Sequence, residues 1–294
     1  MTYTAVGRLY VVATPIGNLG DLSARARGLL KSCALIAAED TRHTGLLLKH
    51  LGIDTPMVSL HEHNEVARAD DIIERLRAGA SIALVSDAGT PAISDPGFDL
   101  VRTAAAAGIE VIAVPGPCAA IAALSIGGLP TDRFCFEGFL PARGAARRKR
   151  LEMLANEART LVFYESPHRV GETLEDCAMA FGDTRSAAVA REITKMHESI
   201  YRGSLRELLA RAQSDPDFRR GEIVLLIAGS PQVVGESDRG ADGHDGALDK
   251  VLNVLLAELP LKQAAHLAAQ ITEVRDNEAY KRALQLKQES ASHS

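Results

Sequence analysis

The sequence predicts an α/β protein with a parallel-sheet N-terminal domain, a mixed-sheet second domain and a small helical C-terminal extension. Two observations support the sheets: apolar runs alternate with helical patterns as far as residue 127, whereas two strand patterns follow each other directly after residue 185. A third supports the extension, because a polar, glycine-rich segment precedes three short amphipathic patterns.

Apolar periodicity and turn residues define the elements of the first part. Strands are expected at 9–13, 34–38, 57–60, 81–85 and 110–114, and helices at 22–31, 41–51, 64–77, 98–107 and 118–124. A strand at 134–140 leads into Pro141 and Gly144, so we expect the N-terminal domain to span 1–140.

The second domain is expected to span 141–230. It contains helices at 145–158 and 168–181 and strands at 161–164, 186–191, 197–202 and 222–228. We expect a flexible linker over 231–247 and a helix-turn-helix-like domain over 248–294, with helices at 248–259, 262–271 and 277–286.

Composition limits the class of protein. The 294 residues are 46% hydrophobic and 24% charged, which is typical of a soluble globular protein. No apolar run is long enough for a membrane span, and the N-terminus lacks the pattern of a signal peptide. The four cysteines are far apart, which favours reduced thiols and a cytoplasmic location. A net charge of −5 gives no overall indication of nucleic-acid binding.

Three loops rich in proline and glycine each follow a predicted buried strand: 14–20, 86–97 and 115–117. Right-handed crossovers bring such loops to one edge of a parallel sheet, where ligands bind in α/β proteins. The sequence therefore predicts a small-ligand cleft. No GxGxxG follows the first strand, so the usual dinucleotide-binding arrangement finds no support.

Six motifs occur together and in order, at 13–19, 38–42, 86–97, 114–117, 165–169 and 191–195. With them the chain resembles the tetrapyrrole-methylase superfamily, and within it the bacterial 16S rRNA (cytidine-2′-O)-methyltransferases. The resemblance covers residues 8–230, and the tail resembles that family's C-terminal helix-turn-helix domain. It implies a two-domain enzyme, a homodimer, that uses S-adenosyl-L-methionine to methylate a cytidine ribose in the decoding region. The implied partner is 16S rRNA or the small ribosomal subunit.

The resemblance also assigns a cofactor site in the cleft between the two domains. Its expected residues are Pro15, Asp87, Gly89, Thr90, Ile93, Pro117, Cys118, Ala119, Tyr164, Glu165, Ala190, Arg191 and Ala228. Glycines suit such a site because they allow close approach of the ligand. Asp95 either joins this site or caps the helix that follows it.

A ribose hydroxyl needs help in losing its proton, so acid–base residues are expected near the cleft. The expected catalytic residues are Glu39, Asp40, Arg42 and Lys195, with His43 and Glu198 as further candidate bases. Glu39 and Asp40 are favoured as the base, with Arg42 positioning a phosphate. Alternatively, Asp40 caps the next helix and pairs with Arg42, and positioning alone supplies the rate.

The expected RNA-binding residues come from the one dense basic run and from a second motif. They are Arg143, Arg147, Arg148, Lys149, Arg150, His168 and Arg169. A basic run of this kind also fits a solvated helix face. The pattern His61-Glu62-His63 lacks further ligands at suitable spacing, so no metal site is expected.

Two other functions are compatible with the sequence. One is methylation of a tetrapyrrole or another acceptor, and the other is a non-catalytic RNA-binding role in ribosome assembly. The basic run and the tail favour RNA over a tetrapyrrole. The three proline- and glycine-rich loops favour a small-ligand pocket over a plain RNA-binding groove.

Overall fold

The computed structural model describes residues 7–61, 64–231, 243–272 and 274–292. It divides into two units, 1–229 and 230–294. None of the helices in these ranges is long and apolar enough to cross a membrane. All four cysteines are free thiols.

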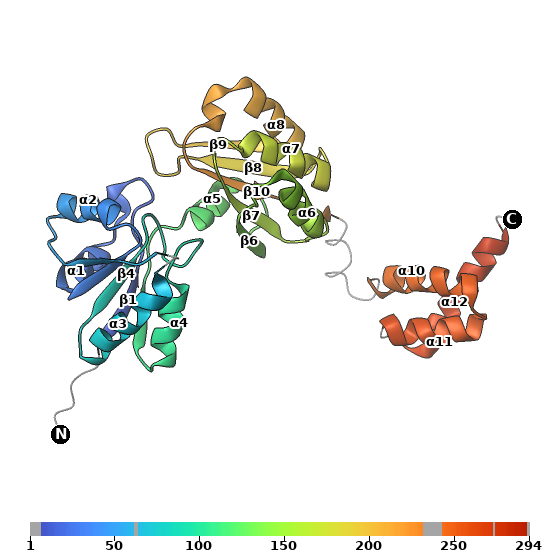
Figure 1. Cartoon of the computed structure of the whole chain (residues 1–294). Coiled ribbons are helices and arrows are strands. Elements are labelled where there is room, and N and C mark those ends of the chain that lie inside the picture. The colour runs from blue at the N-terminus through green and yellow to red at the C-terminus, as the bar shows by residue number, and fades with distance from the viewer. Residues whose placement is uncertain (1–6, 62–63, 232–242, 273, 293–294) are drawn as a thin grey trace. The chain divides into compact units, whose positions relative to one another are not determined.

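The N-terminal sheet is fully parallel, with strand order β3-β2-β4-β1-β5. Its strands β1 and β4 are labelled in Figure 1. Its strands are β1 (Arg8–Val12), β2 (Leu35–Ala38), β3 (Met57–Ser59), β4 (Ile82–Val85) and β5 (Glu110–Val114). Its helices are η1 (Leu19–Asp21), α1 (Ala24–Ser32), α2 (Thr41–Leu51), α3 (Glu65–Arg77) and α4 (Phe98–Ala106). One apolar core joins α1 and α2 to one face of the sheet, and a second joins α3 and α4 to the other.

The second sheet is mixed, as the adjacent strand patterns predicted. Its order is β6-β7-β10-β8-β9, and only the β6–β7 pair is parallel. Its strands are β6 (Phe134–Phe139), β7 (Thr160–Glu165), β8 (Ser186–Arg191), β9 (Ser199–Ser204) and β10 (Ile223–Ile227). Helix α5 (Ala119–Gly127) packs on one face. The other face is covered by α6 (Gly144–Leu154), α7 (Val170–Phe181), α8 (Leu205–Ser214) and η2 (Pro216–Arg219).

Two features differ from the sequence-based expectation. Strand β6 pairs with β7, and α5 buries Ala120 and Ala123 against the second sheet. The division between the two sheets therefore lies between β5 and α5, rather than at residue 140. Helix α8 had no counterpart in the predicted elements. It begins with a capping box, in which Ser204 and Glu207 satisfy each other's backbone N–H groups.

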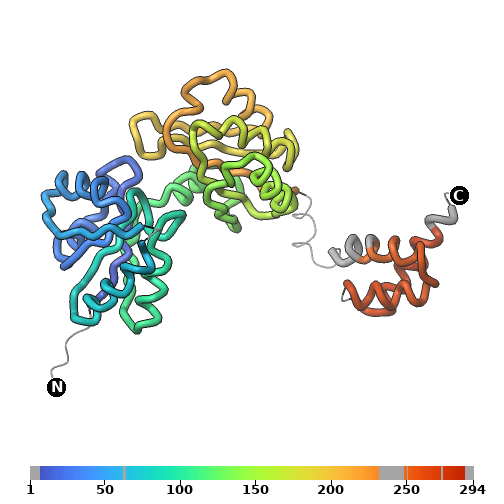
Figure 2. Tube along the Cα trace, viewed as in Figure 1, coloured from blue at the N-terminus to red at the C-terminus, as the bar shows by residue number. Residues whose placement is uncertain are grey.

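The C-terminal unit consists of α10 (Gly243–Glu258), α11 (Leu261–Thr272) and α12 (Asp276–Ser292), as the trace in Figure 2 shows. Leu248 and Leu252 of α10 pack against small residues of the other two helices, including Ala265, Ala268 and Ala279. The three predicted helices are thus confirmed, although α10 begins inside the expected linker. Most of that linker, residues 232–242, lies outside the described residues.

Candidate active site

A cavity of about 350 Å³ lies between the two sheets. The N-terminal sheet contributes residues from the loops after β1 and β4, among them Ile16, Gly89 and Thr90. The second sheet contributes Tyr164 at the end of β7 and Val224 at the start of β10. We call it the inter-sheet cavity. Its volume is in the usual range for sites that bind small molecules.

The three predicted loops are joined by hydrogen bonds at this cavity. The Thr14 N–H donates to the Gly89 carbonyl at 2.8 Å, and the Gly89 N–H donates to the Thr14 carbonyl at 3.1 Å. The Thr90 hydroxyl donates to the Pro117 carbonyl at 3.0 Å. Gly89 has a φ of +84°, and a Cβ there would lie 3.3 Å from Ile16. The loops after β1, β4 and β5 therefore form one wall.

The loop after β4 is strained where it borders the inter-sheet cavity. Ala92 and Ser94 adopt φ angles of 66° and 62°, in the left-handed region that few non-glycine residues occupy. Gly138 of β6 leaves room for this conformation, because a Cβ there would approach the Ser94 hydroxyl to 2.9 Å. Each such residue costs on the order of 1–3 kcal/mol, and such strain is concentrated at functional sites.

Asp95 lies in this loop and lines the inter-sheet cavity. Burial raises the pKa of its carboxyl to about 6, and the negative charges of Glu39 and Asp87 add to the increase. Helix α4 has Gly97 at its N-cap and no side-chain cap. Of the two roles considered for Asp95, the structure therefore supports the cavity and not the cap.

Glu39 and Asp40 are held at the end of β2 by the loop after β4. A Glu39 carboxylate oxygen accepts the Asp87 N–H at 3.3 Å, and Asp87 Oδ1 accepts the Asp40 N–H at 3.0 Å. Asp40 also caps α2 and pairs with Arg42 at 2.6 Å. These hydrogen bonds from Arg42 hold the pKa of Asp40 well below its usual range, so its carboxylate is a weak base. Asp40 therefore adopts the alternative role considered for it, in which it caps α2 and pairs with Arg42 instead of acting as the base.

Lys195 spans the space between the two sheets. Its Nζ pairs with Glu192 at 3.0 Å and with Glu222 at 3.1 Å. Burial lowers its pKa, but the two carboxylates outweigh burial and the pKa is raised. The protonated amine cannot serve as the neutral base expected of it. A Cβ on Gly17 would lie 2.3 Å from Lys195 Cγ, so the lysine stem packs directly on the loop after β1.

Tyr164 lies where α5 meets the second sheet. Its hydroxyl oxygen accepts the Ala120 N–H at 3.3 Å, near the start of α5. Its ring packs edge-on against Phe136 and Phe139, with centroids 5.0 and 5.6 Å away. Burial raises the pKa of the phenol, which therefore stays neutral. Tyr164 thus presents a rigid aromatic surface to the cavity.

Glu165 is buried next to Tyr164, with 3% of its surface exposed. Its carboxylate accepts the Thr173 hydroxyl at 2.6 Å and the Ser166 N–H at 2.7 Å, and Arg169 lies at 3.4 Å. Arg169 in turn donates to the Leu140 carbonyl at 2.8 Å. The carboxylate therefore fixes the turn 166–169, which forms one side of the inter-sheet cavity.

Seven of the residues expected at the cofactor site line the inter-sheet cavity. They are Gly89, Thr90, Ile93, Cys118, Ala119, Tyr164 and Glu165. Pro117 contributes only the carbonyl bound by Thr90. Ala190 is buried beneath α5, and Arg191 holds the β8–β9 hairpin through Ser199 at 3.1 Å. Ala228 follows the far end of β10, away from the end that borders the cavity.

The inter-sheet cavity also has lining residues that the sequence did not indicate. They are Ile16, Ala88, Phe139, Ser166, Pro167, Ile193 and 221–224. Several of them lie within the six sequence motifs, and that position is the signal by which the sequence could have placed them at the site. Gly221 is different: its φ of +74° and its contact with Glu192 become visible only in the folded chain.

The remaining two expected cofactor residues, Pro15 and Asp87, line a second cavity of about 350 Å³. We call it the α2 cavity, because that helix contributes His43, Thr44 and His50 to it. The two cavities are bordered by the same two loops. The α2 cavity was not foreseen from the sequence.

The basic run on α6 is only partly available to a ligand. Arg147 is 3% exposed, bonded to Asp176 at 2.6 Å and to Glu172 at 3.2 Å on α7, so it is not a surface residue. Arg150 pairs with Glu137. Arg148, paired with Asp176 at 3.4 Å, remains half exposed.

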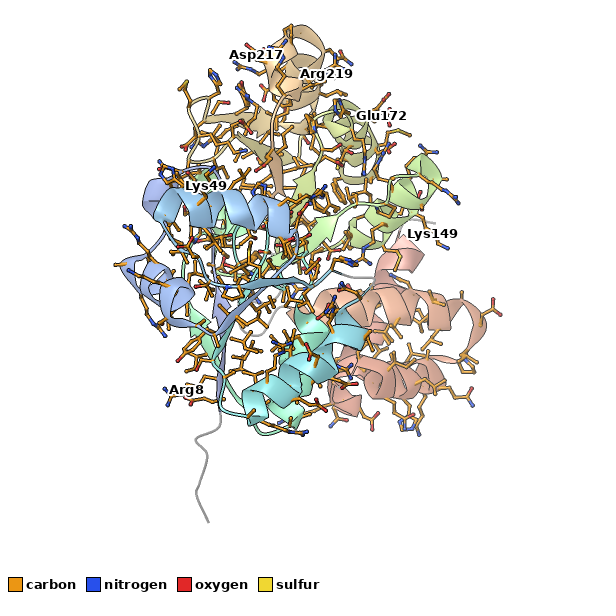
Figure 3. The ribbon with its side chains drawn as sticks, turned by 60° about the vertical axis from the view of Figure 1, so that its left-hand side comes forward. Arg8, Lys49, Lys149, Glu172, Asp217 and Arg219 are labelled. Carbon is orange, nitrogen blue, oxygen red and sulfur yellow. The ribbon has the colours of Figure 1, made fainter. Side chains whose placement is uncertain are left out.

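The exposed members of the expected RNA-binding set are Arg143, Arg148, Lys149 and His168. Lys149 projects outward from α6 in Figure 3. The burial of Arg147 corrects the sequence-based set, because its ion pairs with Glu172 and Asp176 hold α6 against α7. Arg169 donates to the Leu140 carbonyl and is partly exposed, so its contact with RNA stays a prediction.

No group of three or more histidine, cysteine, aspartate or glutamate residues in the described part of the chain is arranged to hold a metal ion. The His61 N–H donates to the Asn64 side chain at 2.8 Å. Glu62 and His63 of the metal-like pattern lie outside the described residues.

This fold and this cavity place the chain among known proteins. Residues 8–209 match the tetrapyrrole (corrin/porphyrin) methylases, and residues 242–287 match the RsmI C-terminal HTH domain. Among solved structures, the methyltransferase CobJ has a TM-score of 0.57 at 21% identity, over 76% of this chain and 95% of its own. Uroporphyrin-III-C-methyltransferase from Thermus thermophilus has a TM-score of 0.52 at 20% identity, over 78% and 98%. These two structures support the fold.

Curated relatives are much more similar in sequence. "Ribosomal RNA small subunit methyltransferase I" of Pseudomonas aeruginosa is 54% identical, over 96% of this chain and 98% of its own. The protein of the same name from Escherichia coli O157:H7 is 52% identical, over 95% of both chains. The chain belongs to the tetrapyrrole methylase family and, within it, to the group of these small-subunit methyltransferase I proteins.

Proposed function

We propose that this chain transfers a methyl group from S-adenosyl-L-methionine to the ribose 2′-oxygen of a cytidine in the decoding region of 16S rRNA. The main supporting observation is the inter-sheet cavity, in which seven of the expected cofactor residues meet. The names of the curated relatives support the choice of small-subunit rRNA as the acceptor.

The inter-sheet cavity suits the proposed cofactor. Ile16, Ile93 and Tyr164 provide apolar and aromatic surface, and the glycine-rich wall offers backbone groups. S-adenosyl-L-methionine supplies an electrophilic methyl group on a sulfonium centre. The carboxylates of Glu39, Asp87 and Asp95 make this region electronegative, which suits a cationic ligand. The chain's main task is to hold the acceptor oxygen in line at about 3–3.5 Å.

Asp95 is the carboxyl group in this cavity best suited to accept the proton of the acceptor hydroxyl. Its pKa of about 6 is closer to neutral pH than that of Asp40, which Arg42 depresses. A general base works best when its pKa lies near the operating pH. Lys195 is protonated, so it would supply a positive charge and ion pairs and would not act as a base. Glu39 remains the second candidate beside Asp95.

The acceptor RNA would lie against the exposed cations near the inter-sheet cavity. His168 adjoins Pro167, which lines that cavity, and shares a shallow hollow with Arg219 and Arg220. Lys149 and Arg148 on α6 add further positive charge. We further propose a cytoplasmic homodimer, as the resemblance implies. Sedimentation equilibrium at micromolar concentration would test the dimer.

The deciding experiment uses labelled S-adenosyl-L-methionine and small ribosomal subunits from cells that lack this gene. We expect label in a 2′-O-methylcytidine of the decoding region, identified by nuclease digestion and mass spectrometry. The control is Ala119→Trp, which fills the inter-sheet cavity and should abolish cofactor binding and transfer together. Label found only in an added tetrapyrrole would overturn the acceptor. Absence of cofactor binding would favour a non-catalytic assembly factor.

A further inference from the structure

The α2 cavity lies behind the same two loops that wall the inter-sheet cavity. In the loop after β1, Ile16 lines the inter-sheet cavity, whereas Pro15 and Gly17 line the α2 cavity. In the loop after β4, Gly89 lines the inter-sheet cavity and Asp87 lines the other. The Thr14–Gly89 backbone bridge joins the two loops. The two cavities therefore share a thin wall built largely of backbone and small residues.

A polar group at the α2 cavity is buried without a partner among the described residues. Thr44 lines the cavity and is 2% exposed, yet its hydroxyl makes no hydrogen bond with any residue that the structure describes. A threonine within a helix commonly bonds back to the carbonyl four residues earlier, but here the Asp40 carbonyl receives only the Thr44 N–H. Buried hydroxyls without partners are costly and rare, so a ligand that hydrogen-bonds to this group would offset that cost.

The other lining residues suit a heteroaromatic ring. Leu19, Leu46 and Leu47 provide apolar surface, and Leu46 is 71% exposed and so accessible to a ligand. His43 and His50 add imidazoles that can stack and form hydrogen bonds. This combination of apolar walls with a few polar groups is typical of sites for small planar ligands. Single-stranded RNA bases are recognised by such groups.

Asp87 adds a feature that favours an amino-substituted base. Its Oδ1 accepts the Asp40 N–H at 3.0 Å, which fixes the carboxylate at the edge of the α2 cavity. A carboxylate has further acceptor positions, and acidic side chains accept hydrogen bonds from the exocyclic amine of cytosine. Uracil carries a carbonyl at that position and would be repelled.

We propose that the α2 cavity holds the base of the acceptor nucleoside, with its ribose beside the loops after β1 and β4 that also border the inter-sheet cavity. Thr44 and Asp87 would read the edge of the base, and the leucines would cover its faces. The inference rests on the proposed function, because it takes the acceptor to be a cytidine of RNA.

Binding of a short single-stranded RNA with the decoding-region sequence tests the proposal without requiring catalysis. Fluorescence anisotropy would be measured with S-adenosylhomocysteine present, for wild type, Thr44→Val and Leu47→Trp. Thr44→Val removes only the hydroxyl, and Leu47→Trp fills the α2 cavity. We expect a loss of RNA affinity of about 10-fold for the first and more for the second. Thr103→Val, on α4 and outside both cavities, is the matched control.

Calorimetry with S-adenosylhomocysteine separates the two cavities. We expect unchanged affinity in Thr44→Val and Leu47→Trp, together with a melting temperature that shows an intact fold. A parallel loss of cofactor affinity would assign the α2 cavity to the cofactor and overturn the proposal. RNA affinity equal to wild type in both variants would also overturn it.

Base selectivity gives the sharper test. Replacing the target cytidine by uridine should weaken binding to the wild type, and Asp87→Asn should reduce that difference because its amide keeps Oδ1 but loses the charge. Equal selectivity in both proteins would refute the role of Asp87. Transfer assays with the same RNA and with small subunits separate a failure of the proposed function from a failure of this inference. Selective RNA binding without methyl transfer contradicts the proposed function alone. Methyl transfer without selectivity for cytidine contradicts this inference alone.

Discussion

Asp95 shows how the fold changes the chemistry of a single residue. In the sequence it stands three residues before the start of a helix, close to the position where aspartate commonly caps. In the structure it lines the inter-sheet cavity near two other carboxylates, and Gly97 takes the N-cap position. Burial and like charges raise its pKa, so its protonation is linked to both stability and activity.

Asp95→Asn should change the pH dependence of folding. Because the pKa of about 6 in the folded chain is above the ordinary aspartate value of 3.8, the stability linked to this carboxyl is present at low pH and is lost as pH rises through about 6. The variant removes that loss, so its stability relative to wild type should be greater at pH 8 than at pH 4. We expect a difference of roughly 1–2 kcal/mol after allowance for solvent screening. Urea unfolding at both pH values measures it, and equal differences would contradict the linkage.

The same variant tests the proposed role of Asp95 in catalysis. If Asp95 accepts the proton, kcat/KM of the wild type should fall below about pH 6, and this acidic limb should disappear in Asp95→Asn along with most of the activity. Steady-state rates between pH 5 and 8 provide the measurement. A variant that keeps both its rate and the limb would exclude Asp95 and favour Glu39.

Arg147 and Lys149, two residues apart, should behave in opposite ways. Arg147→Ala leaves Asp176 buried without its closest partner and should cost about 3–5 kcal/mol of stability. Lys149→Ala should change the free energy of unfolding by no more than about 0.5 kcal/mol relative to wild type. It should also weaken RNA binding, and the loss should be smaller at high salt. Chemical denaturation and RNA titration at two salt concentrations distinguish the residues. Loss of stability in Lys149→Ala would contradict this division.

At the scale of elements, strand ends and helix starts determine the site. Strand β7 delivers Tyr164 and Glu165 to the inter-sheet cavity, and the turn 166–169 then leads into α7. The buried Glu165 links that turn to Thr173 of the helix. The position of the turn therefore depends on a carboxylate that has little room to contact a ligand.

Glu165→Gln tests this structural role. The amide replaces one acceptor by a donor next to Ser166, Thr173 and Arg169, so at least one buried bond is lost. We expect a loss of about 1–3 kcal/mol in the free energy of unfolding. Glu175→Gln, on the exposed face of α7, is the control and should have little effect. Equal effects of the two substitutions in denaturant titrations would refute the role of Glu165.

At the scale of the whole molecule, all lining residues of both cavities belong to residues 1–229. The C-terminal unit has a separate core, formed by α10, α11 and α12. Cofactor binding should therefore be independent of that unit.

A chain ending at Gly229 should fold and bind S-adenosyl-L-methionine with the affinity of the full chain. The physical reason is that truncation removes no residue of the first unit's cores or of the inter-sheet cavity. Calorimetry on both proteins makes the comparison, and thermal unfolding checks the fold. A well-folded truncated protein with weakened cofactor binding would show that the C-terminal unit contributes to the site.

Local patterns in the sequence were sufficient for most of the fold. Alternation of apolar runs with helical patterns predicted the parallel sheet, because buried parallel strands and amphipathic helices leave strong periodic traces. Strand β5 matched its expected range, and the three C-terminal helices were present. Helix α8 and the pairing of β6 with β7 were missed, because adjacency in the chain does not specify which sheet a strand joins.

The site was predicted less completely, since it depends on contacts between distant residues. Motifs identified the loops that form the inter-sheet cavity, and the pairing of Asp40 with Arg42 was one of two alternatives drawn from the sequence. The sequence did not indicate that Lys195 is held by two glutamates or that Arg147 is buried. Nor did it reveal the α2 cavity, or that the Thr44 hydroxyl lacks a partner among the described residues.

The sequence by itself thus determined the fold class, the family resemblance and the loops of the site, because these depend on local composition and order. Only the tertiary structure decided which charged groups are exposed, which are neutralised by partners and which carboxyl has a raised pKa. Those properties arise from burial and from distances between residues that are far apart in the chain.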